Sequence, residues 1–190
     1  IVEHCHDQEK INVLEAGPGT GITTLEILKA DPRVQVVSVD NEPKMLDAVR
    51  TRFSKIEGVG DRVDFILADI LQFLEASQDE SFDAFASVYT LHNFTPTFRR
   101  KVIELIARKL KSGGIFINGD KYAREGQEHK NDFNAEIENY AKFETAAVEA
   151  EKKGDLDRAA HLRKIREEWV NHAAEDETNK ITVEEQNRMF

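Results

Sequence analysis

The chain has 190 residues, with 26 Lys or Arg against 36 Asp or Glu, so its formal net charge is −10. Hydrophobic residues make up 40% of it and charged residues 33%, which is typical of a globular protein with a sizeable core. The excess of carboxylates argues against general nucleic-acid binding, which needs a basic surface. No apolar run is long enough to span a membrane, and no signal-peptide pattern opens the sequence. The single cysteine, Cys5, cannot form an internal disulfide, so a reducing, cytoplasmic setting is expected.

Short apolar runs alternate with amphipathic stretches over the first two-thirds of the chain. Strands are predicted at 11–15, 34–40, 63–68, 82–88 and 115–118. Helices are predicted at 20–30, 42–54, 70–76 and 97–110. Lys111–Gly114 is expected to end the last of these helices, with a glycine in the left-handed conformation. The alternation predicts an α/β fold: a doubly wound, mostly parallel sheet with helices on both faces.

The sequence becomes charged and alanine-rich after residue 122, and an α-helical hairpin inserted after strand five is predicted at 123–174. Gly154 suits the position after a helix end, and Asp155 suits the start of the next helix. Two apolar stripes follow helical spacing: Phe133, Ile137, Tyr140, Ala147 and Val148, then Leu162, Ile165, Trp169 and Ala173. Such stripes need burial, either as a lid on the core or in a homodimer. The stretch 175–190 is expected to be a polar linker.

Three alternating glycines follow the first predicted strand, in the segment Glu15-Ala16-Gly17-Pro18-Gly19-Thr20-Gly21. Glycine allows a sharp strand-to-helix turn and a close approach by a ligand. A dinucleotide-binding turn would place its third glycine at position 22, which is Ile22 here, and a P-loop would need Gly-Lys before Ser or Thr. The pattern favours a ligand held without phosphate contacts. A tight turn with no ligand is the alternative.

Acidic residues stand at the expected carboxyl ends of three strands, at Glu15, Asp40 and Asp69. Together they would repel a phosphate ligand and suit a cationic one with a diol. With the glycine turn, they resemble the class I S-adenosylmethionine-dependent methyltransferases, a Rossmann-like superfamily, over residues 12–121. A further match is the segment Leu110–Phe116, which resembles the family's turn into strand five.

The resemblance implies S-adenosylmethionine as cofactor and S-adenosylhomocysteine as its product. It assigns the ribose hydroxyls to Asp40 and the adenine amino group to Asp69, although Asp69 also suits a helix N-cap. Glu15 has a cofactor role in this assignment, with a simple structural role at the turn as the alternative. The cofactor-binding residues expected are Glu15, Gly17, Pro18, Gly19, Gly21, Asp40, Asn41, Met45, Asp69 and Ile70.

The segment Tyr89-Thr90-Leu91-His92-Asn93 resembles the family's substrate-facing edge. His92 is expected as base or substrate contact, with a purely structural histidine as the alternative. Tyr89 is a second catalytic candidate, through its hydroxyl or a cation–π contact. The Asp/Asn-Pro-Pro-Tyr motif of nucleobase and glutamine-amide methylation is absent, since Asn93–Pro96 differs from it. A small molecule or protein side chain is therefore the expected acceptor, with no nucleic acid and no membrane.

No metal is expected, because the N-terminal segment 4–7 has no second pair of ligands to complete a zinc site. Two other functions remain open: a non-catalytic scaffold that binds S-adenosylmethionine and associates through its hairpin, and an NAD(P)-dependent oxidoreductase. The family's N-terminal helices and last two strands are not recognisable in the sequence. We therefore expect that the chain is a fragment.

Overall fold

The computed structural model describes residues 1, 3, 5, 8–120, 122, 133–175 and 182–189, with the backbone alone at 133–140 and 168–175. The chain forms two compact units. The first comprises Ile1–Lys121 with Glu185–Phe190, and the second comprises Tyr122–Glu184.

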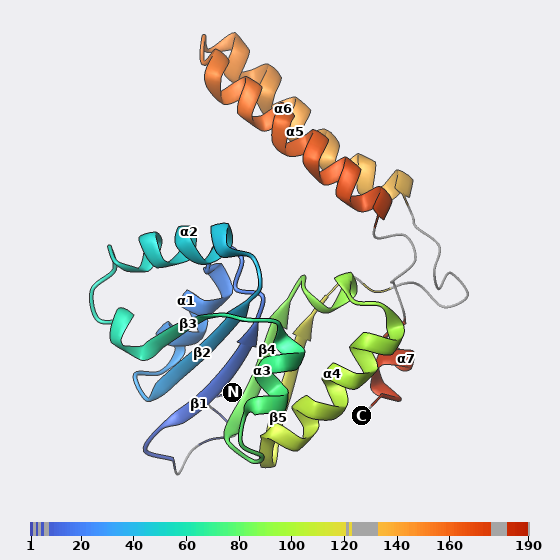
Figure 1. Ribbon diagram of the computed structural model, residues 1–190. Coiled ribbons are helices and arrows are strands. Elements are labelled where there is room, and N and C mark those ends of the chain that lie inside the picture. The colour runs from blue at the N-terminus through green and yellow to red at the C-terminus, as the bar shows by residue number, and fades with distance from the viewer. Residues whose placement is uncertain are drawn as a thin grey trace. The chain divides into compact units, whose positions relative to one another are not determined.

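A five-stranded parallel sheet forms the centre of the first unit (Figure 1). Its strands are β1 (Ile11–Ala16), β2 (Val34–Asp40), β3 (Val63–Leu67), β4 (Phe82–Val88) and β5 (Leu110–Gly119). They lie in the order β3-β2-β1-β4-β5, and every neighbouring pair is parallel. The strand order therefore reverses between β1 and β4. In open sheets of this kind, ligands bind at that switch point, beyond the carboxyl ends of the strands.

Helices cover both faces of the sheet. They are α1 (Ile22–Ala30), α2 (Pro43–Phe53), α3 (Ile70–Ala76) and α4 (Pro96–Lys109), with short 3-10 helices η2 (Gly60–Arg62) and η3 (Leu91–Asn93). One core joins the sheet to α1 and α2 through residues such as Leu28 and Val49. The other joins it to α3 and α4 through residues such as Leu74 and Ile106. The predicted doubly wound α/β fold is confirmed.

The connection from α4 to β5 differs from the prediction. The helix ends at Lys109, and Leu110 is already extended, with φ −71° and ψ 138°. Gly113 has a φ of 78°, but it lies within β5, where the pairing with β4 shifts register between Phe82 and Ala84. The glycine therefore serves an irregularity in the strand rather than the helix end, because pairing with β4 begins as soon as α4 stops.

The second unit contains a pair of long helices, α5 (Phe133–Lys152) and α6 (Leu156–Glu175). Gly154 has a φ of 78° between them, and Asp155 Oδ1 accepts a hydrogen bond from the Arg158 amide at 3.1 Å. The predicted helix–turn–helix is confirmed.

Small residues form the contact between the two helices, with Ala147, Ala150 and Ala159 buried together against Leu162. Val148, which belongs to the predicted stripe, is partly exposed. The side chains of five other predicted stripe residues lie outside the described part of the chain: Phe133, Ile137, Tyr140, Trp169 and Ala173.

The C-terminal segment contains a further helix, α7 (Val183–Asn187). Thr182, Gln186 and Met189 are buried, and Glu185–Phe190 belongs to the first compact unit. The expected polar linker at 175–190 is therefore wrong for the residues that the structure describes there, while 176–181 lie outside them. None of the described helices is long and apolar enough to cross a membrane.

Candidate functional site

A cleft opens at the carboxyl edge of the sheet, at the switch between β1 and β4. Its cavity volume is about 60 Å³, below the roughly 300–1,000 Å³ of pockets that enclose small molecules, so the cleft is shallow. Its lining residues are Ala16, Gly17, Val39, Asp40, Asn41, Ala68, Asp69, Ile70, Thr90 and Phe94. Two of them are carboxylates and none of those described is a cation. The cleft therefore favours a neutral or cationic ligand.

The turn after β1 depends on glycine at three positions. Gly17, Gly19 and Gly21 have φ values of 69°, 52° and 76°, in the left-handed region that other residues rarely adopt. A Cβ at Gly17 would lie 2.2 Å from Thr90 Oγ1, and a Cβ at Gly21 would lie 2.4 Å from Val49 Cγ2. Nothing lies within 4 Å of a Cβ at Gly19. Packing inside the protein explains two of the glycines, whereas the space at Gly19 is open to a ligand.

Glu15, the penultimate residue of β1, is a buried carboxylate with a relative exposure of 1%. Its Oε2 accepts hydrogen bonds from Thr24 Oγ1 at 2.7 Å and from Ser38 Oγ at 2.8 Å. Burial raises the pKa of Glu15, the nearby charge of Asp40 adds to this effect, and the two hydroxyl groups oppose it. A desolvated carboxyl group beneath the glycine turn is costly for the fold alone, which favours a functional role.

Asp40, the last residue of β2, and Asp69, two residues after β3, each bond one carboxylate oxygen to the backbone that follows. Asp40 Oδ1 accepts from the Glu42 amide at 2.9 Å. Asp69 Oδ1 accepts from the amides of Leu71 at 2.9 Å and Gln72 at 3.1 Å, so the alternative prediction that Asp69 caps a helix is confirmed. Because these hydrogen bonds use Oδ1 in both residues, Oδ2 remains available to a ligand in the cleft.

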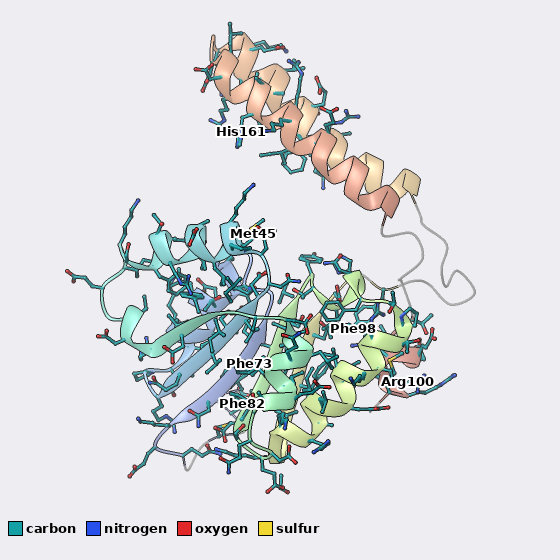
Figure 2. All side chains as sticks on the ribbon, viewed as in Figure 1. Met45, Phe73, Phe82, Phe98, Arg100 and His161 are labelled. Atoms are coloured by element: carbon teal, nitrogen blue, oxygen red, sulfur yellow. The ribbon has the colours of Figure 1, made fainter. Side chains whose placement is uncertain are left out.

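The loop after β4 forms the wall opposite the glycine turn. It begins at Tyr89, whose φ of 53° is rare for a residue with a side chain and whose amide donates to Gly119 O at 2.9 Å. Thr90 then fills the space that Gly17 leaves beside it, and Phe94 completes the wall. The ring of Phe94 packs edge-on against Phe98, which is labelled in Figure 2.

His92 lies within this loop, on η3, and has a relative exposure of only 4%. Its Nδ1 lies 2.5 Å from Asp120 Oδ1, and its amide donates to Asp120 Oδ2 at 2.9 Å. The carboxylate therefore holds both the backbone and the ring of His92. When Nδ1 carries the proton of a neutral imidazole, Nε2 is left as an acceptor.

The structure distributes the predicted site residues unevenly. Gly17, Asp40, Asn41, Asp69 and Ile70 line the cleft, and Pro18, Gly19 and Gly21 form the adjoining turn. Glu15 and His92 are buried, and each lies within two residues of a lining residue in the sequence. Tyr89 is 62% exposed and does not line the cleft. Met45, labelled in Figure 2, is 44% exposed and does not line it either.

Sequence reasoning missed Thr90, Phe94 and Asp120. The available signal for Asp120 was its position directly after the fifth strand, where a carboxylate reaches the same edge as Asp40 and Asp69. Within the described residues no group of three or more His, Cys, Asp or Glu side chains is placed to hold a metal ion, and His4, His6 and Asp7 lie outside them.

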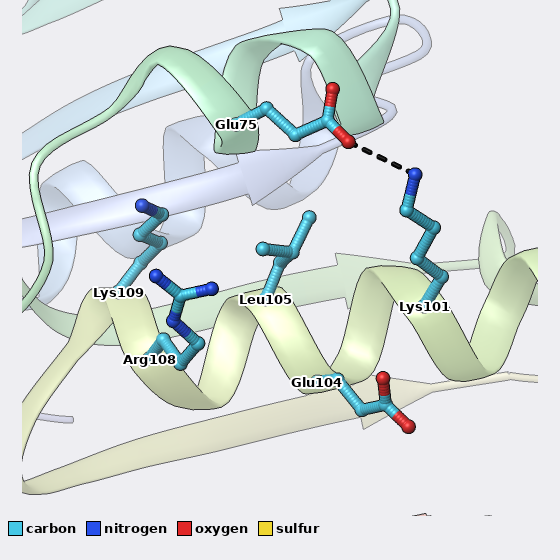
Figure 3. A pocket seen from close by; sticks show the side chains of 6 residues that line it. All are labelled: Glu75, Lys101, Glu104, Leu105, Arg108 and Lys109. Atoms are coloured by element: carbon cyan, nitrogen blue, oxygen red, sulfur yellow. Dashed lines mark hydrogen bonds and ion pairs between the residues drawn. The ribbon is translucent and has the colours of Figure 1, made fainter.

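A second, larger hollow lies on the surface along α3 and α4, away from the strand ends (Figure 3). It is lined by Glu75, Lys101, Glu104, Leu105, Arg108 and Lys109. Lys101 pairs with Glu75, while Arg108 and Lys109 pair with Asp79. Each of its described cations is thus already in an ion pair, and the cleft at the switch point is the better candidate site.

Comparison with known proteins agrees with this geometry. The profile of a family described as "Methyltransferase domain" matches residues 13–114, more than half of the chain. This chain belongs to the methyltransferase family. The matched part runs from β1 through the glycine turn and the ends of β2 to β4, and S-adenosylmethionine is the cofactor of this family.

Individual relatives cover only part of the chain. The carboxy-S-adenosyl-L-methionine synthase of Nautilia profundicola is 30% identical over 122 residues, which are 64% of this chain and 48% of that protein. The sterol 24-C-methyltransferase of Yarrowia lipolytica is 30% identical over 129 residues, 65% of this chain and 32% of that one. A solved structure from Galdieria sulphuraria, assigned as a sarcosine dimethylglycine methyltransferase, has a TM-score of 0.60 at 14% identity and covers 89% of this chain and 75% of its own. The chain thus spans about half or less of these curated relatives.

The residues of the cleft fit this cofactor. The open space at Gly19 admits a ligand close to the backbone, and the carboxylates suit a molecule that carries a sulfonium, an ammonium and a diol.

Proposed function

We propose that this chain binds S-adenosylmethionine in the cleft between β1 and β4 and transfers its methyl group to a small molecule or a protein side chain. One observation carries the proposal. A glycine turn with open space at Gly19 lies at the same edge of the sheet as two carboxylates, after β2 and β3, whose Oδ2 atoms have no hydrogen bond from the described residues. This combination suits an adenosyl cation and disfavours a pyrophosphate.

Each predicted cofactor residue then has a distinct role. Asp40 Oδ2 accepts hydrogen bonds from the ribose hydroxyls, and Asp69 Oδ2 accepts one from the adenine amino group. Asn41 and Ile70 flank the adenine from either side of the cleft. The backbone at Gly17, Pro18, Gly19 and Gly21 holds the methionine part, and Met45 contributes apolar contact at the mouth of the cleft.

Glu15 attracts the ammonium group of the cofactor. Its Oε2 is taken by the two hydroxyl groups, and its Oε1 has no hydrogen bond from the described residues. A cation at this point would lower the energetic cost of the buried carboxylate, because opposite charges interact strongly when water is excluded.

The bound cofactor supplies an activated methyl group, and the protein aligns the acceptor with it. His92 is the proposed acceptor of the substrate's proton, because it lies in the loop that walls the cleft and Asp120 holds its ring. Tyr89 is the second candidate. Its exposed hydroxyl could contact the acceptor at the entrance to the cleft rather than within it.

Titration calorimetry with S-adenosylmethionine, S-adenosylhomocysteine and NAD tests the site. We expect the two adenosyl ligands to bind and NAD to give no signal. Asp40→Asn is expected to weaken binding about 10- to 100-fold, because it removes a charge-assisted pair of hydrogen bonds. Saturable binding of NAD alone would instead support an oxidoreductase.

Mass spectrometry of reaction mixtures tests the activity. Methyl transfer predicts S-adenosylhomocysteine and an acceptor heavier by one methylene. A carboxylated sulfonium product would instead indicate the reaction named for the Nautilia relative, and binding without turnover across acceptor classes would indicate a scaffold. Either outcome contradicts the proposed transfer.

We further propose a cytoplasmic enzyme that forms homodimers through the hairpin 123–174. Support for the dimer comes from partly exposed apolar residues on these helices, including Val148 and Leu156. Light scattering on the full chain and on a variant lacking 133–174 tests this. A monomeric full chain at micromolar concentration contradicts the dimer.

A further inference from the structure

A buried guanidinium lies beneath the loop that walls the cleft. Arg99 lies in the first turn of α4, with a relative exposure of 2%, whereas its neighbour Arg100 is exposed (Figure 2). Arg99 Nε donates to Leu91 O at 2.9 Å, and Nη2 donates to His92 O at 3.3 Å and Phe94 O at 3.2 Å. One side chain thus donates to three carbonyl groups within four residues of the same loop.

These carbonyls belong to the segment that shapes the cleft. The segment starts at the positive φ of Tyr89, a conformation that costs on the order of 1 kcal/mol and persists only when its surroundings fix it. It then places Thr90 Oγ1 where a Cβ at Gly17 would lie, and Phe94 against the cleft. The position of this wall therefore depends on contacts that lie below it.

Arg99 provides those contacts from one side, and Asp120 provides them from the other through the amide and ring of His92. A planar guanidinium with five fixed donors can serve several carbonyls at once, which the single ammonium group of lysine cannot do with the same geometry. Without it, the carbonyl groups of His92 and Phe94 would lose this donor, Leu91 O would keep only the Phe94 amide, and the loop is expected to relax toward solvent.

The geometry points to Arg99 as a positioning residue for cofactor binding: it holds the Tyr89–Phe94 loop in the conformation that forms one wall of the cleft. The inference rests on the proposed function, since it takes the cleft to be the S-adenosylmethionine site. Arg99 does not line the cleft itself, so it acts through Thr90 and Phe94.

The same helix offers a matched control. Lys109, in the last turn of α4, is also buried and also cationic, and its Nζ donates to Ser77 O and to Asp79 Oδ1, both at 2.6 Å. Removing either charge costs the fold a buried hydrogen-bonded cation. Only the change at Arg99 frees the wall of the cleft.

The test compares Arg99→Met and Arg99→Lys with Lys109→Met in full-length protein, using S-adenosylhomocysteine as the calorimetric probe. We expect Arg99→Met to weaken binding about tenfold or more and Arg99→Lys to weaken it to a smaller extent. Lys109→Met is expected to bind with an affinity within about twofold of the parent protein. Hydrogen exchange at the amides of Asn93 and Phe94 is expected to speed up in both Arg99 variants and to stay unchanged in Lys109→Met.

Should Arg99→Met fail to fold, Arg99→Lys carries the test with the same two measurements. Unchanged affinity and unchanged exchange in Arg99→Lys would overturn the inference, as would equal losses of affinity in Arg99→Met and Lys109→Met. If the parent protein itself binds no S-adenosylhomocysteine, the proposed function fails. Hydrogen exchange at Asn93 and Phe94 then still tests separately whether Arg99 holds the loop.

Discussion

Replacing Gly19 with alanine separates the cost of a backbone conformation from the loss of a ligand contact. Gly19 has a φ of 52°, and its added Cβ would meet nothing within 4 Å. Gly58 provides a control with the same property: its φ is 74°, and its Cβ also meets nothing. Each substitution pays the left-handed strain of alanine, partly offset by a less flexible unfolded chain, so each is expected to lower the free energy of unfolding by about 1 kcal/mol.

The two variants should differ in ligand binding. At Gly19 the new methyl group enters the space that we assign to the methionine part of the cofactor, and a loss of about 1.4 kcal/mol would appear as tenfold weaker binding of S-adenosylhomocysteine. At Gly58 no change of affinity is expected. Urea unfolding and titration calorimetry on both variants give the two quantities, and equal affinities for Gly19→Ala and Gly58→Ala would refute the assigned position of the ligand.

Three further changes test other parts of the site and the fold. Glu15→Gln is expected to weaken S-adenosylhomocysteine binding about tenfold by removing the charge opposite the ammonium, and to increase the free energy of unfolding more at neutral than at acidic pH. The sign follows because burial raises the pKa of Glu15, so that its ionisation costs stability as the pH rises. Asp120→Asn is expected to weaken that binding as well, because Asp120 also holds the Tyr89–Phe94 loop, and to mix the imidazole tautomers of His92, which long-range proton–nitrogen NMR detects. A single unaltered tautomer would contradict the positioning role of Asp120. Hydrogen bonds from Arg33 lower the pKa of Asp31 to about 2. The stabilisation that they give is complete at pH values above the ordinary pKa of an aspartate and is lost as the pH falls toward 2. Acid unfolding of Asp31→Asn is therefore expected to lack this pH-dependent component.

The sequence was sufficient for the parallel strands and for the acids at their ends. Alternating apolar runs predict the strands, and Asp40 and Asp69 then follow because parallel strands end at one edge of the sheet. Local hydrogen bonds explain why these positions could be named residue by residue, since each carboxylate bonds to an amide within three residues of itself. Local rules are enough for such contacts.

The wall of the cleft could not be predicted in the same way. Asp120 meets His92 across 28 residues, and Thr90 meets Gly17 across 73. No periodicity encodes such partners, because they depend on β1, β4 and β5 being neighbours in the sheet. The same reason explains why the prediction of Gly113 as the end of a helix was wrong: the pairing of β5 with β4 prevailed over the local sequence pattern of a helix cap.

The polypeptide leaves the sheet-containing unit at Tyr122 and re-enters it at Glu185. The paired helices are therefore an excursion tethered at both ends rather than an appended tail. The entropic cost of closing such a segment changes only slowly with its length. Replacing it with a longer or shorter segment should therefore destabilise the fold less than changing a strand of the sheet. The paired helices can therefore change in length or sequence while both connections to the sheet-containing unit are kept.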